Sequence, residues 1–334
     1  MTIRIGVHNG NPSLFFLARL EHVLDTFDEP LELYFYGDGT RTARLLAEGT
    51  IDIGGTGSTP PLIAQADGLP LVYVAASAPR PGHGALVTAV PGPDGGVHTV
   101  ADLRGKPVAF AEGSWHTHFL AELLDGAGLA YQDVEPRAPG PKTADLLRKG
   151  EVAAWVAQGA DLVRAEASPD LVVLAGTAGV VPDRSVFFTR PDFAATRPRA
   201  VAALAGALRQ ADEWVKANPR EAAHLAEEAL GGSVDAWEVA LARFPWRLEP
   251  ITPRFLDEQQ EAADILYAQN LLRRPIDVSE AANPDLAPVV AEALTAVAGR
   301  GETPADKRRV RIGSARSRSR RGMNAAVAHR SQRA

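Results

Sequence analysis

Two loops rich in small polar residues carry the residue types that could bind an anion. The first, residues 57–61, reads Gly-Ser-Thr-Pro-Pro and follows an apolar run at residues 51–54. Its backbone amides and the Ser58 and Thr59 hydroxyls would lie at the positive end of a helix, where an oxyanion is stabilised. Thr59 could also act as the cap of that helix ahead of the prolines. No Gly-Lys-Ser/Thr follows, so the loop is not a P-loop.

The second loop, residues 111–118, reads Ala-Glu-Gly-Ser-Trp-His-Thr-His and follows a second apolar run. Its donors would face those of the first loop across a cleft. Trp115 could pack against the apolar tail of a bound anion, or it could be buried in a core. His116 and His118 stand at positions i and i+2 of a helix and do not share a face. With no third ligand nearby, we predict no metal site.

The sequence offers little for catalysis. It has no cysteine and only five lysines, none of them in these two loops. Disulfides, thiolate metal sites and a cysteine nucleophile are therefore excluded, and a lysine Schiff base is disfavoured. We predict no cofactor. An enzyme would have to use His8, His116 or His118 as its acid or base.

Strands and helices alternate up to residue 190 and would position the loops. Apolar runs predict strands near residues 3–7, 32–36, 51–54, 70–76, 85–90, 107–111, 152–156, 171–175 and 185–189. Helical patterns lie near residues 12–26, 41–48, 59–67, 115–127, 142–149 and 158–167, and then near 197–217, 219–230, 234–243, 253–270 and 285–298. This order predicts an α/β fold of mostly parallel sheets flanked by helices, with a helical C-terminal region.

An internal repeat divides the chain into two similar parts. Residues 42–51 and 143–152 share the pattern Thr-Ala-x-Leu-Leu-x-x-Gly-x-Ile/Val at an offset of 101 residues. Two α/β lobes connected by two crossings would follow, and such a pair forms a hinge. The predicted lobes are a discontinuous lobe 1, residues 1–85 and 188–300, and lobe 2, residues 86–187.

Charge is distributed unevenly along the 334 residues, whose formal net charge is −6. Residues 301–334 hold ten Lys and Arg against two acidic residues, so the other 300 residues carry 25 basic against 39 acidic residues, or −14. An acidic body has little with which to neutralise phosphate backbones, which argues against a nucleic-acid function. Residues 301–334 could contact nucleic acid or anionic lipid, but they have no apolar periodicity, so we predict that they form a basic, disordered tail. Residues 1–7 read as a strand, not an export signal, so the sequence as written predicts a cytoplasmic location.

The chain resembles the aliphatic-sulfonate, taurine and nitrate substrate-binding proteins of ABC importers, within the superfamily of thiamin pyrimidine synthase-like proteins. The matching segments are residues 57–66, 71–74, 99–110, 112–114, 211–214, 218–223, 250–252 and 258–260, so the likeness covers about residues 3–280. It implies the two-lobed periplasmic-binding-protein fold, type II. Residues 153–160 keep Trp155 but lack the later Trp, Asp and Pro of the family pattern, which leaves the cleft wall and the choice of ligand open.

The resemblance and the loops together place a ligand between the lobes, with Trp115 and Trp155 on either side of its organic tail. Arg41, Arg80 and Arg184 are candidate counter-charges, or else surface residues. The predicted ligand-binding residues are Asn9, Gly10, Asn11, Ser13, Gly57, Ser58, Thr59, Gly113, Ser114, Trp115, His116, Thr117, Trp155 and Gln158.

By resemblance we expect hinged binding of a small organic anion, most simply a sulfonate, as the substrate-binding component of an ABC importer. Permease and ATPase subunits would then be partners, the protein would be a monomer, and its location would be extracytoplasmic if a leader is missing. The alternative is a cytoplasmic enzyme on the same fold that acts on a sulfonate, a sulfinate or a pyrimidine-like molecule.

We predict that Ser58→Ala combined with Ser114→Ala weakens anion binding at least tenfold, which corresponds to ~1.4 kcal/mol, without unfolding the chain. The reason is the loss of two hydroxyl donors from facing loops. Calorimetric titration checks this prediction, and unchanged affinity would reject the assignment of these two loops.

Overall fold

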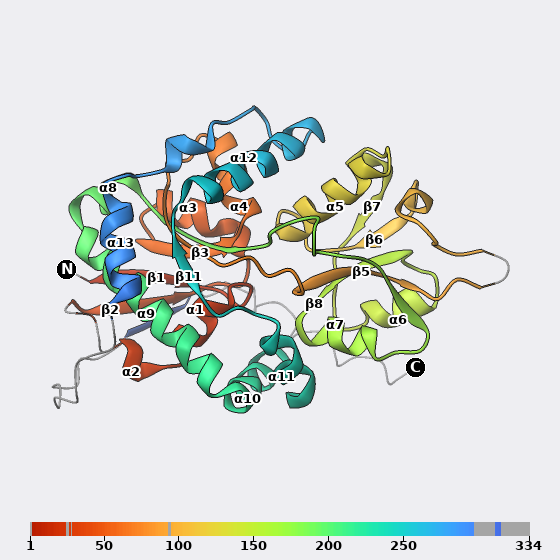
Figure 1. The fold of residues 1–334 in the computed structure, drawn as a ribbon, viewed down its shortest axis with the longest axis horizontal. Coiled ribbons are helices and arrows are strands. Elements are labelled where there is room, and N and C mark those ends of the chain that lie inside the picture. The colour runs from red at the N-terminus through yellow and green to blue at the C-terminus, as the bar shows by residue number, and fades with distance from the viewer. Residues whose placement is uncertain (1, 25–26, 28, 93–94, 297–310, 315–334) are drawn as a thin grey trace, which may run out of the picture.

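Two β-sheets joined by two crossings of the chain form the frame of the molecule (Figure 1). The computed structural model describes residues 2–24, 27, 29–92, 95–296 and 311–314. The first sheet has seven strands in the order β11 (Leu248–Pro250), β4 (Val72–Ser77), β10 (Ser185–Thr189), β3 (Ile53–Gly57), β1 (Ile3–Val7), β2 (Leu31–Phe35) and β12 (Arg311–Ser314). The second has five, in the order β7 (Glu135–Arg137), β6 (Pro107–Ala109), β8 (Ala154–Gln158), β5 (Gly84–Ala89) and β9 (Leu171–Gly176).

Helices cover both faces of each sheet. Around the first sheet lie α1 (Pro12–Leu17), α2 (Glu21–Leu24), α3 (Thr42–Ala47), α4 (Thr59–Ala66), α8 (Pro191–Thr196), α9 (Pro198–Ala217), α12 (Pro253–Ala268) and α13 (Leu286–Thr295). Around the second lie α5 (Trp115–Gly126), α6 (Thr143–Arg148) and α7 (Gly159–Glu166). The hairpin of α10 (Pro219–Leu230) and α11 (Val234–Ala242) extends from α9 and reaches α7. Short 3-10 turns are η1 (Gly39–Arg41), η2 (Val100–Leu103), η3 (Tyr131–Asp133) and η4 (Val278–Ala281).

Most strands of each sheet run in one direction. In the first sheet β1, β2, β3, β4 and β12 share a direction, and β10 and β11 oppose it. In the second, β5 alone opposes the other four. The chain enters β5 and β10 directly after each crossing between the sheets. These two strands therefore begin at the edge of the sheet where the neighbouring strands end. The prediction of two mostly parallel sheets in a two-lobed α/β fold is confirmed.

Alternation along the strands places a core on each face of each sheet. In β4, Val72 and Val74 face the core under α9, whereas Tyr73 faces the core under α12. In β8, Val156 packs toward α5 and Trp155 packs toward α6 and α7. This period of two is the geometry of a strand that is buried on both faces.

Most predicted elements are present, with three kinds of difference. The helix expected at residues 12–26 is split into α1 and α2. After α1 the amide of Arg19 bonds to the Phe16 carbonyl at 2.9 Å, while the Arg19 side chain takes the Phe15 carbonyl at 2.8 Å, so the regular i to i−4 pattern stops. β7, β11 and α8 were not predicted: β7 and β11 have three residues and contain a proline, and α8 has six residues. The predicted tail lies outside the described residues, apart from Arg311–Ser314, which form β12 beside β2.

The repeat corresponds to equivalent structural units. α3 and α6 are each followed by a glycine at positive φ, Gly49 at 67° and Gly150 at 73°, and then by β3 and β8. We propose that the lobe boundaries lie in the two crossings, residues 78–83 and 177–184, because the strands on either side of each crossing belong to different sheets.

None of the helices in the described part of the chain is both long and apolar enough to cross a lipid bilayer.

A buried arginine fixes the second crossing to the first sheet. The Nη1 of Arg184 donates to the Ser77 carbonyl at 2.7 Å and to Glu249 of β11 at 2.8 Å, and its Nε donates to Glu258 of α12 at 2.7 Å. The Arg184 side chain is only 4% exposed. It is therefore neither a surface residue nor a free counter-charge for a ligand.

We expect Arg184→Ala to lower the free energy of unfolding by about 2–3 kcal/mol, because Glu249 and Glu258 lose their buried partner and keep only exposed ones, Arg247 and Arg254. Chemical denaturation measures this loss. Arg254→Ala is a matched control, since Arg254 also pairs with Glu258 but its side chain is 80% exposed. It should cost less than about 1 kcal/mol. Equal losses for the two variants would contradict the role given to Arg184.

Candidate functional site

Four loops at the carboxyl ends of strands meet where the two sheets face each other. They follow β1 and β3 in the first sheet and β6 and β8 in the second, and each leads into a helix. A Cβ placed on Gly113 would lie 3.2 Å from Cγ2 of Thr40, and one on Gly57 would lie 3.5 Å from Cβ of Trp115. Loops of the two sheets are therefore in close contact. In α/β sheets, this edge is where ligands bind.

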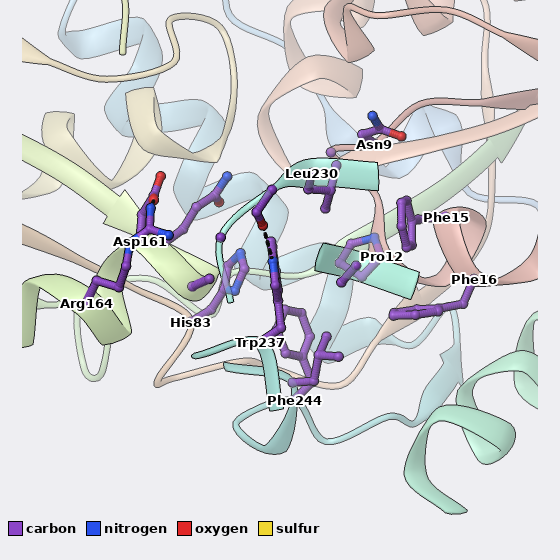
Figure 2. Close-up of a pocket in the computed structure, with 18 residues that line it drawn as sticks. Asn9, Pro12, Phe15, Phe16, His83, Asp161, Arg164, Leu230, Trp237 and Phe244 are labelled. Carbon is purple, nitrogen blue, oxygen red and sulfur yellow. Dashed lines mark hydrogen bonds and ion pairs between the residues drawn. The ribbon is translucent and has the colours of Figure 1, made fainter. Parts of the chain in front are cut away.

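A cavity of about 250 Å³ opens between the loops after β1 and β8 and the α10–α11 hairpin (Figure 2). Its lining combines a small set of polar residues with a larger set of apolar ones. The polar set is Asn9, His83, Gln158, Asp161 and Arg164, and Gly10, Gly159, Gly231 and Gly232 add backbone surface. The apolar set is Pro12, Phe15, Phe16, Ala160, Ala226, Leu230, Trp237, Leu241 and Phe244.

Three of the predicted ligand-binding residues line this cavity: Asn9, Gly10 and Gln158. The others lie deeper or elsewhere. Trp155 lines a different cavity, next to α6 and α7, together with Arg148 and Leu171. Sequence reasoning did not select Phe15, Phe16, Trp237 and Phe244. Spacing could not distinguish them from ordinary core residues, since three of them lie on helices and Phe244 follows α11.

Trp115 fills the space between the two predicted anion loops. Its Nε1 donates to Oε1 of Gln158 at 3.0 Å, and its ring packs so closely on Gly84 that any side chain there would collide with it. It is 6% exposed and belongs to the core beneath α5. Of the two readings that the sequence left open for Trp115, the geometry favours burial.

The hydroxyls and amides of the inner loops bond mainly to their own backbone. Ser114 caps α5, because its Oγ accepts from the His116 amide at 3.1 Å and donates to the Ala111 carbonyl at 2.6 Å. Thr117 accepts from the Gly113 amide at 2.8 Å. These contacts fix the shape of the second loop.

Asn11 and Ser58 connect the first loops to neighbouring elements. Asn11 caps α1 through the Leu14 amide at 3.2 Å and donates to the Thr56 carbonyl at 3.3 Å. The Ser58 carbonyl accepts from Gln259 of α12 at 3.2 Å. Ser13 and Thr59 are buried, and the Thr59 hydroxyl has no partner among the described residues. Ser58 precedes α4 without a side-chain cap, so Thr59 is the first residue of the helix and not its cap.

A buried charged cluster lies below the cavity, at the crossings. Arg80 donates to the Asp183 carboxylate at 2.9 Å and to Ser185 at 3.2 Å. Arg80 is 3% exposed, so the expectation of a surface residue or a free counter-charge is wrong for it as well. Arg41 is exposed and does not line the cavity.

Burial keeps His83 and His116, near the cluster, neutral. Burial lowers the pKa of His83 well below its usual value, and the positive charge of Arg80 lowers it further. Burial also lowers the pKa of His116 to about 4. His118 lies 3.2 Å from Glu122. No group of three or more His, Asp or Glu side chains that could hold a metal ion is present in the part of the chain that the structure describes.

His116 should make stability depend on pH. Between its folded pKa of about 4 and its ordinary value near 6.5 the unfolded chain binds more protons, so stability falls as the pH drops through this range. The quantity to compare is the free energy of unfolding of the parent chain minus that of His116→Asn. We expect this difference to fall by on the order of 3 kcal/mol from pH 7 to pH 4. Asparagine can still accept from the Ala111 amide. Denaturation curves at several pH values test this, and a constant difference would contradict it.

Comparisons with known proteins agree with this architecture. The chain is 26% identical over 282 residues to a putative aliphatic sulfonates-binding protein of Escherichia coli K12, which covers 83% of this chain and 87% of that protein. The alkanesulfonate-binding protein SsuA of Xanthomonas axonopodis pv. citri, solved with MOPS, superimposes with a TM-score of 0.73 at 27% identity, covering 84% of this chain and 98% of that one.

The periplasmic aliphatic sulphonate binding protein SsuA of Escherichia coli superimposes with a TM-score of 0.74 at 24% identity, covering 84% of this chain and 91% of that one. These matches confirm the resemblance and the fold inferred from the sequence. The NMT1/THI5-like family matches residues 30–222, which is more than half of the chain. The chain belongs to the NMT1/THI5-like family.

Proposed function

We propose that the protein binds a small organic sulfonate in the cavity between its two sheets, as the substrate-binding component of an ABC importer. One observation carries the proposal: a cavity that combines hydrogen-bond donors with aromatic side chains lies where loops of both sheets meet. The similar proteins of Escherichia coli and Xanthomonas are named for binding aliphatic sulfonates and alkanesulfonates.

The start of α7 supplies the anion-binding end in this proposal. No side chain caps this helix, and the first amides of a helix have no partner within it. Gly159, at a φ of 58°, begins the helix in a conformation that favours glycine, and it lines the cavity. The amides and the positive end of the helix dipole therefore face the cavity, with Gln158, the residue before the helix, as a further donor.

The deeper predicted residues have a supporting role in this proposal. Asn11, Ser114 and Thr117 hold the loops in shape, and Trp115 orients the Gln158 amide by donating to its Oε1. The prediction for Ser58→Ala with Ser114→Ala would then act through loop geometry more than through lost ligand contacts. Gly57, Thr59 and His116 do not line the cavity and would pack beneath these loops.

Binding would be coupled to closure about the two crossings. α7 of the second sheet contacts α11, Arg243 pairs with Glu166 at 3.1 Å, and the ring of Trp237 covers Gly159. A ligand that touches both sides favours the closed arrangement by its differential contacts. Release to a permease would require these contacts to open.

Partners and location follow from the same proposal. An importer component works with permease and ATPase subunits, and it captures its ligand outside the cytoplasm. The similar Escherichia coli protein is described as periplasmic. For the enzyme alternative, the three histidines that the sequence offered as acid or base, His8, His116 and His118, do not line the cavity.

We expect Gln158→Ala to weaken sulfonate binding about tenfold, because a hydrogen bond to a charged group is lost. Isothermal titration calorimetry with ethanesulfonate and benzenesulfonate measures the effect. Gln132→Ala is the matched control, since Gln132 is exposed and does not line the cavity. If neither sulfonate binds the parent chain, the proposed function is wrong.

A further inference from the structure

We infer that the cavity selects sulfonates that carry an aromatic ring over sulfonates with a short alkyl chain. This inference rests on the proposed function and concerns the same cavity. The observations that carry it are the separation of the charged α7 side chains from the aromatic side chains, the fixed positions of the aromatic rings, and the volume.

The charged side chains of α7 and the aromatic side chains occupy different parts of the cavity, whereas Asn9 lies on the same side as Phe15 (Figure 2). Figure 2 places Asp161 and Arg164 on one side and Phe15 and Phe16 on the opposite side, with Trp237 and Phe244 between them. An anion bound at the start of α7 would therefore direct its tail along Trp237 and Phe244. A short alkyl chain would leave much of this apolar surface uncovered.

The aromatic side chains are held in place before a ligand arrives. The Phe244 ring stacks on Trp246 with centroids 5.0 Å apart, and His83 meets it edge-on at 4.7 Å. Trp246 in turn contacts Phe16 edge-on at 5.6 Å. Rings fixed in this way lose little freedom when a ligand packs against them, which favours binding.

Trp237 is held independently of the Phe244 cluster. Its Nε1 donates to the Gly231 carbonyl at 2.7 Å, a bond drawn as the dashed line in Figure 2. The indole is half-buried and lines the cavity. It therefore offers a flat apolar surface in a fixed orientation, and flat aromatic rings pair in offset-stacked or edge-to-face geometry.

The volume agrees with a ring plus an anionic group. An apolar cavity of ~150 Å³ can hold benzene. The cavity measures about 250 Å³, so a phenyl ring at the aromatic end would leave space for a sulfonate at the polar end. Ethanesulfonate would leave most of the apolar end filled by water.

The test compares three sulfonates by isothermal titration calorimetry on the full chain: ethanesulfonate, cyclohexanesulfonate and benzenesulfonate. We expect benzenesulfonate to bind at least tenfold more tightly than ethanesulfonate, with cyclohexanesulfonate between them. The saturated ring matches the size of phenyl but lacks its flat π-face, and ring pairing is worth roughly two- to tenfold beyond buried area.

Two substitutions assign the selectivity to Trp237. Trp237→Phe and Trp237→Leu both lose the bond to Gly231, but only Trp237→Phe keeps a ring. We expect Trp237→Leu to weaken benzenesulfonate binding about fivefold and ethanesulfonate binding less than twofold, and Trp237→Phe to retain most of the preference. Tyr267→Leu is the matched control, because Tyr267 is 45% exposed and does not line the cavity.

The outcomes separate this inference from the proposed function. If ethanesulfonate binds as tightly as benzenesulfonate, the function stands and the inference is overturned. Equal affinity for cyclohexanesulfonate and benzenesulfonate overturns the aromatic preference in the same way. Loss of ethanesulfonate binding in Trp237→Leu, parallel to that of benzenesulfonate, would show a general structural role for Trp237 and would also overturn it. Binding of none of the three would reject the function and the inference together.

Discussion

The two crossings between the sheets are the constraint on which the rest of the structure depends. Each crossing carries a buried arginine, and both guanidinium groups are matched by carboxylates: Arg80 by Asp183, and Arg184 by Glu249 and Glu258. A buried charge is tolerated only when it is paired in this way. Each arginine must therefore stay next to its carboxylates, and this requirement fixes the position of the crossing. Because the crossings enter the sheets through β5 and β10, the parallel strands end at the opposing edges, where the loops meet.

The way in which the edges meet determines where a ligand has room. Between the loops after β3 and β6 the space is occupied by Trp115, which packs on Gly84 and donates to Gln158. The cavity is therefore displaced toward α7 and the α10–α11 hairpin. Its wall is built partly by a helical region that follows both repeated units in sequence, and that region supplies Trp237 and Phe244.

This displacement explains which parts were predictable from sequence. Strands and long helices were predicted because apolar periodicity and Gly-containing turns are local properties of the chain. The repeat of residues 42–51 at residues 143–152 indicated the second sheet. Asn9, Gly10 and Gln158 were found because they lie at or just after the carboxyl ends of strands, where sites in such folds lie. Trp237 was missed because its partner is Gly159, and a contact between residues 78 positions apart has no signature in either segment.

The charges on the cavity lining explain why the aromatic side chains matter for binding the proposed ligand. The ionised groups that line the cavity, Asp161 and Arg164, pair with each other, and burial keeps the neighbouring His83 neutral. An anion would therefore meet dipoles, those of the α7 amides and of Asn9 and Gln158, instead of a net positive charge. Dipoles orient a sulfonate but compensate only part of the cost of removing it from water. In a cavity of this kind most of the affinity has to come from the apolar tail, so the shape of the aromatic wall decides which sulfonate is bound.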